Sequence, residues 1–260
     1  MTSIRAYVRG AVAAAVLFSA STAGAVGVSL DLQKFERSDL VSAQGAMRNF
    51  VQGHSISNLH YENFESNNAW NGSFGTTNPK NTGVGNFKAY GATGSGHSVV
   101  GDGASLAVRN DAAMPWGRYH ANTPNQSIVG GNWLDSNDNQ GIKWRIKDKG
   151  EFNAISFFVV DAADVGGKFS IKVGDKKFSN LAGNTRLSNG NIHYVTIMLD
   201  EAVDDLTIKM GHNRNNDGFG IDGVMVAKVA PVPLPPAAAL LFTGVAALAG
   251  IRYRRKSAKA

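Results

Sequence analysis

The chain has 260 residues, a formal net charge of +6, 30 glycines and no cysteine. The absence of cysteine excludes thiol catalysis and thiolate metal sites. All 20 acidic residues but only 19 of the 26 basic ones lie between residues 26 and 231. That segment is therefore almost neutral, which removes the main argument for a nucleic-acid partner.

The first 25 residues have the parts of a secretory signal peptide. Arg5 and Arg9 precede the apolar stretch AVAAAVLFSA, and Ala23 and Ala25 fit the small-residue cleavage site that follows it. We expect signal peptidase to remove residues 1–25 during export.

A helical pattern comes next, over about residues 39–51. Leu40, Ala43, Met47 and Phe50 recur there at near-helical spacing, which predicts a short amphipathic helix. Beyond it, short apolar or alternating segments are separated by turn residues, a pattern typical of a β-sandwich or barrel. These segments are LHYENFES, VGNFKAY, SLAVRN, GIKWRI, FNAISFFVVDA, GKFSIKVG, HYVTIMLD, DDLTIKMG and GIDGVMVAKV.

Residue patterns within these segments predict which faces are buried. AISFFVV is apolar on both faces and should be central, whereas FSIKV and LTIKM alternate and should each have one wet face. Trp144 alternates with isoleucines and should lie in the core.

Two segments are predicted in more detail. Leu59, Tyr61 and Phe64 are expected on one face of their strand, and the pair Asp204-Asp205 is expected in a solvated turn. The stretch from Val226 is expected to begin the linker to the tail.

Residues 229–260 contain a proline-rich VPVPLPP, an apolar run from Ala237 to Ile251 and the basic end RYRRKSAKA. An apolar helix stopped by basic residues is held by the membrane with its basic end in the cytoplasm. The run is shorter than the roughly 17–25 residues of a spanning helix unless flanking residues also insert. A plain C-terminal anchor and a processed tail are both open interpretations.

This tail resembles the PEP-CTERM class of sorting signals, in its VPLPA variant. The resemblance implies processing by an exosortase, a membrane-embedded transpeptidase-like enzyme of Gram-negative bacteria that also make exopolysaccharide. Pro236 stands where the variant usually has alanine, which leaves the cut position open. The matching residues are Val232, Pro233, Leu234, Pro235, Arg252, Arg254, Arg255 and Lys256.

Residues 26–228 resemble jelly-roll domains of the carbohydrate-binding-module kind, through NFE-SNNAW and DGFGIDGVMV. In those domains the last strand carries Ile-Asp-Asp-Val, whereas here Gly223 replaces the second aspartate. The stretches GGNWLDSNDNQGIKW, FFVVDAADVGG and NNDGFGIDGV are also similar to ectodomains of other VPLPA-tailed proteins. The implied fold is mainly β: a single jelly-roll-like β-sandwich with one short N-terminal helix, between the signal peptide and a C-terminal transmembrane sorting helix.

The jelly-roll resemblance implies a structural Ca²⁺ between the first and last strands, held by Glu62 or Glu65 and by Asp222. Asp135 and Asp138, in the oxygen-rich LDSNDN, form a second candidate, because calcium takes six to eight oxygen ligands. The alternative is that these residues only form turns by bonding to the backbone. No other cofactor is expected.

Trp116, Arg118 and Tyr119, in the loop-like PWGRYH, are the expected glycan contacts, since aromatic rings stack on the apolar faces of sugars. The alternative is that they pack at a sheet edge.

The six histidines show no metal-binding spacing, and the sequence has no G-x-S-x-G elbow and no phosphate loop. We therefore expect a non-enzymatic, exported protein of the cell surface or exopolysaccharide matrix, with weak glycan binding. Its expected partners are signal peptidase, exosortase, the inner membrane and a polysaccharide. A secreted polysaccharide-active hydrolase, with two carboxylates facing across a groove, is one alternative. A purely structural surface protein without a ligand is another.

Overall fold

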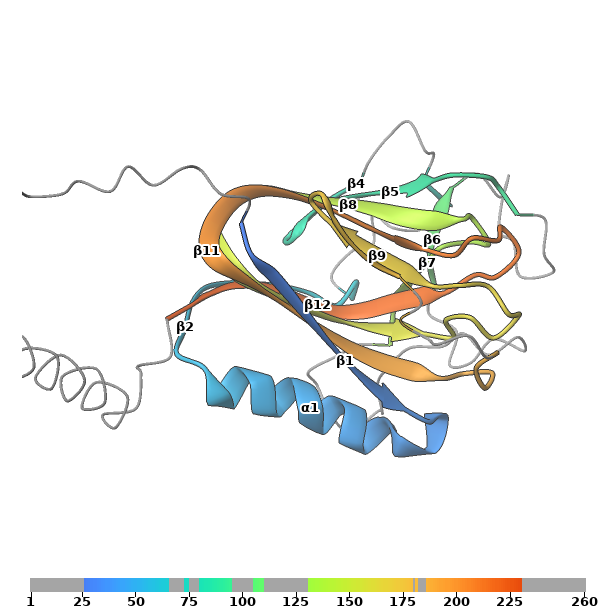
Figure 1. The fold of residues 1–260 in the computed structure, drawn as a ribbon, viewed down its shortest axis with the longest axis horizontal. Helices are drawn as coiled ribbons and strands as arrows, with labels where there is room; N and C mark the ends of the chain where they lie inside the picture. Colours follow the sequence, from blue (N-terminus) through green and yellow to red (C-terminus); the bar gives the residue numbers. More distant parts are fainter. Residues whose placement is uncertain are drawn as a thin grey trace, which may run out of the picture.

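The computed structural model describes residues 26–65, 73–74, 80–94, 105–109, 131–179, 181 and 186–230 (Figure 1). The predicted signal peptide, the loop around Trp116 and the sorting signal lie outside these residues. No helix in this described part is long and apolar enough to cross a membrane.

The described residues form one α-helix, a single 3-10 turn and an antiparallel sheet of 12 strands. The helix α1 covers Leu40–Gly53 and follows the 3-10 turn at Arg37–Asp39. The prediction of a mainly β domain with one short helix is therefore confirmed. The strands are β1 (Val28–Phe35), β2 (Ile56–Glu62), β3 (Ser73–Phe74), β4 (Lys80–Thr82), β5 (Gly85–Tyr90), β6 (Leu106–Arg109), β7 (Trp133–Asp135), β8 (Gly141–Val160), β9 (Ser170–Val173), β10 (Lys176–Ser179), β11 (Ile192–Gly211) and β12 (Gly220–Val229).

Two long strands, β8 and β11, build both layers of the domain. Each has 20 residues and they pair with each other at both ends. Their register shifts between Met198 and Asp205, where β11 turns back on itself (Figure 1). On β8, Asp148 and Gly150 have positive φ values of 58° and 70° near the same bend. The strands thus fold over, and the sheet becomes a two-layered, sandwich-like structure.

The two layers have different partners. Layer A consists of β4, β5, β9 and β10 together with residues 141–147 of β8 and 205–211 of β11. Layer B consists of β1, β2 and β12 together with residues 152–160 of β8 and 192–198 of β11. Strands β7, β6 and β3 extend the sheet from one end of β12.

The main core lies between the layers and has Trp144 near its centre. This side chain is fully buried, as predicted, and its indole Nε1 donates to the carbonyl oxygen of Val84 at 2.9 Å. Its ring stacks on Phe87 at a centroid distance of 5.3 Å and meets the Phe157 ring edge-on at 6.0 Å. Layer A supplies Trp144 and Phe87, and layer B supplies Phe157, so these contacts join the two layers.

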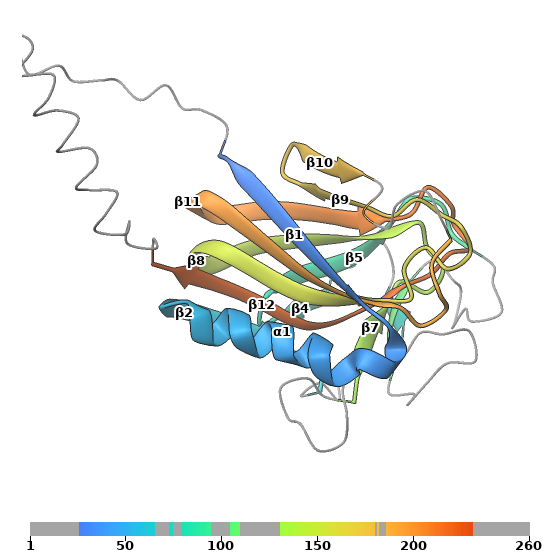
Figure 2. The ribbon, with the colours of Figure 1, turned by 60° about the horizontal axis from the view of Figure 1, so that its bottom comes forward.

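A second cluster lies between α1 and layer B (Figures 1 and 2). Ala43 and Met47 of α1 pack there against Phe158 and Tyr194. Because α1 covers one face of this part of β8 and the main core covers the other, AISFFVV is buried on both faces. This explains its continuous apolar pattern and confirms the prediction that it is central.

Two pairs of predicted strands are single strands. GIKWRI and FNAISFFVVDA both belong to β8, and HYVTIMLD and DDLTIKMG both belong to β11. The prediction of a solvated turn at Asp204-Asp205 is wrong, because both residues lie within β11. The prediction of a linker from Val226 is also wrong, since β12 continues to Val229.

The predicted common face is found for Leu59 and Tyr61, which line one groove beside α1, but is wrong for Phe64. Leu59 is 50% exposed, Tyr61 packs against the α1 cluster, and Phe64 is fully buried in the main core. The reason lies in the backbone: β2 ends at Glu62, and Phe64 has a positive φ of 60° that takes it out of the strand's alternation.

Candidate functional site

Five lysines lie in one row across the outer face of layer A. Lys88 of β5 is the cross-strand partner of Lys143 of β8, and Lys143 is the partner of Lys209 of β11. Lys209 in turn pairs with Lys172 of β9, which pairs with Lys177 of β10. Directly opposed residues of antiparallel strands project on the same face. We call these five residues, Lys88, Lys143, Lys209, Lys172 and Lys177, the lysine row.

The strand period places the row on the outside. Lys143 alternates with Ile142 and Trp144, which are fully buried in the core. Lys209 likewise lies between two buried residues, Ile208 and Met210. Since successive side chains of a strand point to opposite faces, burial of the neighbours turns each lysine toward solvent.

The row concentrates positive charge that is little neutralised. Neighbouring strands lie about 4.8 Å apart, so five strands carry five ammonium groups over about 19 Å. Within the described residues, Lys172 alone among the five has a carboxylate within 4 Å: the fully exposed Asp175, at 3.8 Å. Like charges directly opposite each other destabilise a sheet. An anion lying along the row would relieve this repulsion.

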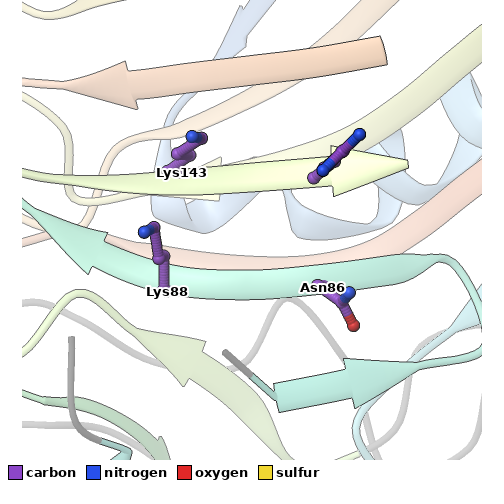
Figure 3. Close-up of a pocket in the computed structure, with 4 residues that line it drawn as sticks. Asn86, Lys88 and Lys143 are labelled. Carbon is purple, nitrogen blue, oxygen red and sulfur yellow. The ribbon is translucent and has the colours of Figure 1, made fainter. Parts of the chain in front are cut away.

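Arg145 lies at one side of the row, and its charge is compensated by Asp205. It pairs with Asn86 of β5 across the strands, and Asp205 holds its guanidinium through contacts of 2.6 and 3.1 Å. This hydrogen-bonded pairing raises the pKa of Arg145 and lowers the pKa of Asp205. Asn86, Lys88, Lys143 and Arg145 together line a hollow of about 180 Å³. Figure 3 shows Lys88 on β5 and Lys143 on the neighbouring strand β8.

A second row of uncharged residues runs parallel to the lysine row, two positions along each strand. It follows the same register, and its members are Tyr90, Gly141, Gly211, Ser170 and Ser179. We call this set the neutral row. Two strand residues span about 6.7 Å, so the rows are close enough for one bound chain to contact both.

The side chain of Tyr90 lies across the two glycines of the neutral row. A Cβ at Gly141 would stand 2.5 Å from Cε1 of Tyr90, and a Cβ at Gly211 would stand 3.0 Å from its hydroxyl. A larger residue at Gly141 would therefore displace the ring. Burial raises the pKa of Tyr90, and the Nζ of Lys209 lies 6.0 Å from the ring centroid.

Tyr90 also borders a larger hollow of about 410 Å³. Both serines of the neutral row line this hollow, together with Gln140 and Lys177. The hollow thus combines an aromatic ring, hydroxyl and amide groups, and a cation from the lysine row. These groups suit a ligand that carries both hydroxyls and negative charge.

Three predicted calcium ligands, Glu62, Glu65 and Asp222, act on the same tyrosine, Tyr61. Burial raises the pKa of the Tyr61 hydroxyl, and the nearby charges of Asp222, Glu62 and Glu65 raise it further. The carboxylate of Glu62 accepts the N–H groups of Phe64 at 2.8 Å and of Gly83 at 3.3 Å.

The other two carboxylates of this group also accept backbone N–H groups. Glu65 accepts the N–H of Asn132, and Asp222 accepts that of Gly223 at 2.7 Å. Gly223 has a φ of 55°, at a register shift of β12. This backbone conformation favours glycine over the aspartate of the resembled motif.

The second predicted calcium loop is buried. The carboxylate of Asp135 accepts hydrogen bonds from Nε of Arg109 at 2.6 Å and from the backbone N–H of Asn137 at 3.0 Å. Asp138 is 3% exposed. In the described ranges no three acidic or histidine side chains converge as a metal site requires. Calcium at either place remains a prediction.

Trp116, Arg118 and Tyr119 lie outside the described residues, so the structure does not relate them to the lysine row. The lysine row itself is not among the sites predicted from the sequence. The only sequence signal for it is the isolated lysine that each of several alternating strands carries.

No family model and no curated protein matches this sequence. Among solved structures, the chain is similar to one described as the crystal structure of the Agl-KA catalytic domain, with 13% sequence identity and a TM-score of 0.29. The alignment covers 64% of this chain and 30% of that chain. A similarity at this level supports no argument about activity or ligand.

Proposed function

We propose that this protein is exported, processed at both ends, and retained at the cell surface or in the extracellular matrix by binding polyanionic chains, without catalysing a reaction. The observation that carries the proposal is the lysine row. Five cations in register across five strands form a linear site that is too long for a small anion.

The geometry favours an extended ligand with repeated negative charges. Each lysine contributes modestly, because exposed ion pairs are weak and are screened by salt. A polymer gains by making several such contacts at once, since later contacts form intramolecularly. Each ion pair of the proposed interaction is therefore weak, and the affinity comes from several such pairs formed along the lysine row.

Export is proposed from the two ends of the sequence. Arg5, Arg9 and the apolar stretch after them support cleavage by signal peptidase. The proline-rich stretch, apolar run and basic end of residues 229–260 support a membrane-bound intermediate and processing by an exosortase. The loop around Trp116 is proposed as a further glycan contact.

We also propose that the domain is a single jelly-roll-like β-sandwich. Two features support this finer assignment. The layers are built entirely from antiparallel pairs, and the core between them is formed by side chains of both.

Fractionation of cells that produce the native chain tests location and retention together. We expect the protein in the matrix or surface fraction, with a mass showing loss of residues 1–25 and of the tail after about Val232. We expect about 0.5 M NaCl to release it, because the Debye length falls to a few ångströms at such salt concentrations. An equimolar increase in sucrose is the control.

Two results would contradict the proposal. An intact chain of 260 residues in the soluble cytoplasmic fraction would exclude export. A processed protein that salt does not release, or that is never retained, would exclude charge-dependent binding.

A further inference from the structure

We infer that the polyanion is an acidic polysaccharide, which lies across the strands with its anionic groups over the lysine row and one sugar ring on Tyr90. This inference rests on the proposed function and narrows its ligand. It depends on the second, uncharged row beside the lysines.

The two rows match the two kinds of surface that an acidic polysaccharide presents. Such a chain carries carboxylate or sulfate groups along one side and hydroxyl-bearing rings along the rest. The lysine row faces the first, and the neutral row offers Ser170 and Ser179 to the second. The side chain of Tyr90 covers Gly141 and Gly211, so a polymer lying along the neutral row would meet this ring rather than the backbone.

Tyr90 gives the site a ring-sized contact. One side of its ring rests on the glycines, and the side chain borders the hollow of about 410 Å³. A flat aromatic ring held in this way covers the apolar face of a pyranose with little loss of side-chain freedom. The ammonium of Lys209 lies over the ring, 6.0 Å from its centroid. A stacked sugar would displace this ammonium sideways, where it could pair with a carboxylate of the same sugar.

Other polyanions use only part of this surface. Polyphosphate would contact the lysine row and gain nothing from the hydroxyls or from Tyr90. Single-stranded DNA would place its phosphates on the lysine row and stack a base on Tyr90, but it carries no hydroxyl-bearing rings along the neutral row. These two ligands therefore serve as the competing outcomes of the test.

The test measures binding of the full chain, purified in a non-ionic detergent, to three fluorescently labelled anionic oligomers of equal charge and to one uncharged control. The probes are an oligogalacturonate, a polyphosphate, a single-stranded DNA and an uncharged dextran of similar length. We expect the oligogalacturonate to bind most tightly at equal salt, and the dextran to bind at least about 30-fold more weakly because it lacks charge.

Substitutions at Tyr90 separate the ring from the charges. Tyr90→Leu keeps an apolar cover over the glycines but removes the flat ring, and should weaken oligogalacturonate binding about ten-fold. The same variant should leave polyphosphate binding unchanged, and Tyr90→Phe should retain binding of both. Tyr61→Leu, in the α1 cluster of layer B, is the matched control and should change neither. Thermal unfolding of each variant reports whether the fold is kept.

The possible results separate this inference from the proposed function. If polyphosphate or DNA binds as tightly as the oligogalacturonate, the polysaccharide is not the preferred ligand and the inference is overturned, while polyanion binding stands. If no anionic probe binds, the proposed function itself fails. If Tyr90→Leu does not fold, the order of affinities for the four probes, measured with the unchanged chain and with Tyr90→Phe, tests the inference instead. Loss of preference for the sugar in Tyr90→Phe would also overturn the inference.

Discussion

Replacing Lys143 and Lys209 together with glutamine is expected to weaken binding of a polyuronate to the full chain by about 30-fold at low salt. The two residues are neighbours at the centre of the lysine row, between Lys88 on one side and Lys172 on the other. A lysine close to an anionic surface contributes about 1 kcal/mol, and 1.4 kcal/mol corresponds to a ten-fold change in affinity. Fluorescence polarisation of a labelled polyuronate measures the effect.

The matched control removes the same charge elsewhere. Lys34 of β1 and Lys228 of β12 lie in layer B, where each pairs with a glutamate at 3.1 and 2.5 Å respectively. Replacing both with glutamine should change affinity by less than about three-fold. Equal weakening in the two double variants would mean that net charge, rather than the lysine row, governs binding. The Lys143 and Lys209 variant should also be at least as stable as the parent, because it removes two directly opposed like charges.

Trp144→Ala is expected to lower the free energy of unfolding by about 3–5 kcal/mol, a large part of the roughly 5–15 kcal/mol typical of a folded domain. The side chain is fully buried and contacts rings from both layers. Its removal leaves a cavity at the junction of the layers and an unpaired carbonyl at Val84. Urea unfolding followed by far-UV circular dichroism measures the loss.

Two further substitutions divide this effect into its parts. Trp144→Phe keeps a ring but removes the indole N–H, so it should cost about 1–3 kcal/mol. Leu59→Ala, at a half-exposed position on β2, should cost less than about 1 kcal/mol. A cost below about 1 kcal/mol for Trp144→Ala would show that the two layers do not pack as described.

The local patterns of the sequence predict the element types well. The near-helical spacing of Ala43 and Met47 identifies α1, because these residues face Phe158 and Tyr194 of layer B. The continuous apolar run in β8 identifies a strand covered on both sides. Such patterns can be recognised within a few residues, because the spacing of the apolar residues shows which faces of an element are buried.

The bend in the long strands is harder to predict. Asp148 and Gly150 on β8, and Asp204 and Asp205 on β11, are residues that also form turns. Here they occupy positions where the strands curve from one layer into the other. A short polar stretch gives no local sign of whether the chain reverses or continues beyond a register shift.

The lysine row is not predictable from single segments. Alternation places Lys172 and Lys209 on wet faces, as expected for FSIKV and LTIKM. Their alignment with Lys88 and Lys143 depends on the register of strands that are far apart in the sequence. A shift of one residue in any pairing would break the row.

The role of the carboxylates in the predicted calcium sites is also hard to predict from the sequence. The charges of Glu62, Glu65 and Asp222 all act on the Tyr61 hydroxyl. Each also accepts a backbone N–H. Oxygen-bearing side chains near strand ends serve either role, and the sequence alone does not distinguish them.

Acetylation of lysine amines, read by mass spectrometry with and without a bound polyuronate, tests the central claim most directly. The full chain should show reduced modification at Lys88, Lys143, Lys172, Lys177 and Lys209 when the polymer is present. Lys34 and Lys228, in layer B, should be modified equally in both conditions. Protection of Lys34 and Lys228 without protection of the lysine row, or uniform protection of all lysines, would contradict binding at the outer face of layer A.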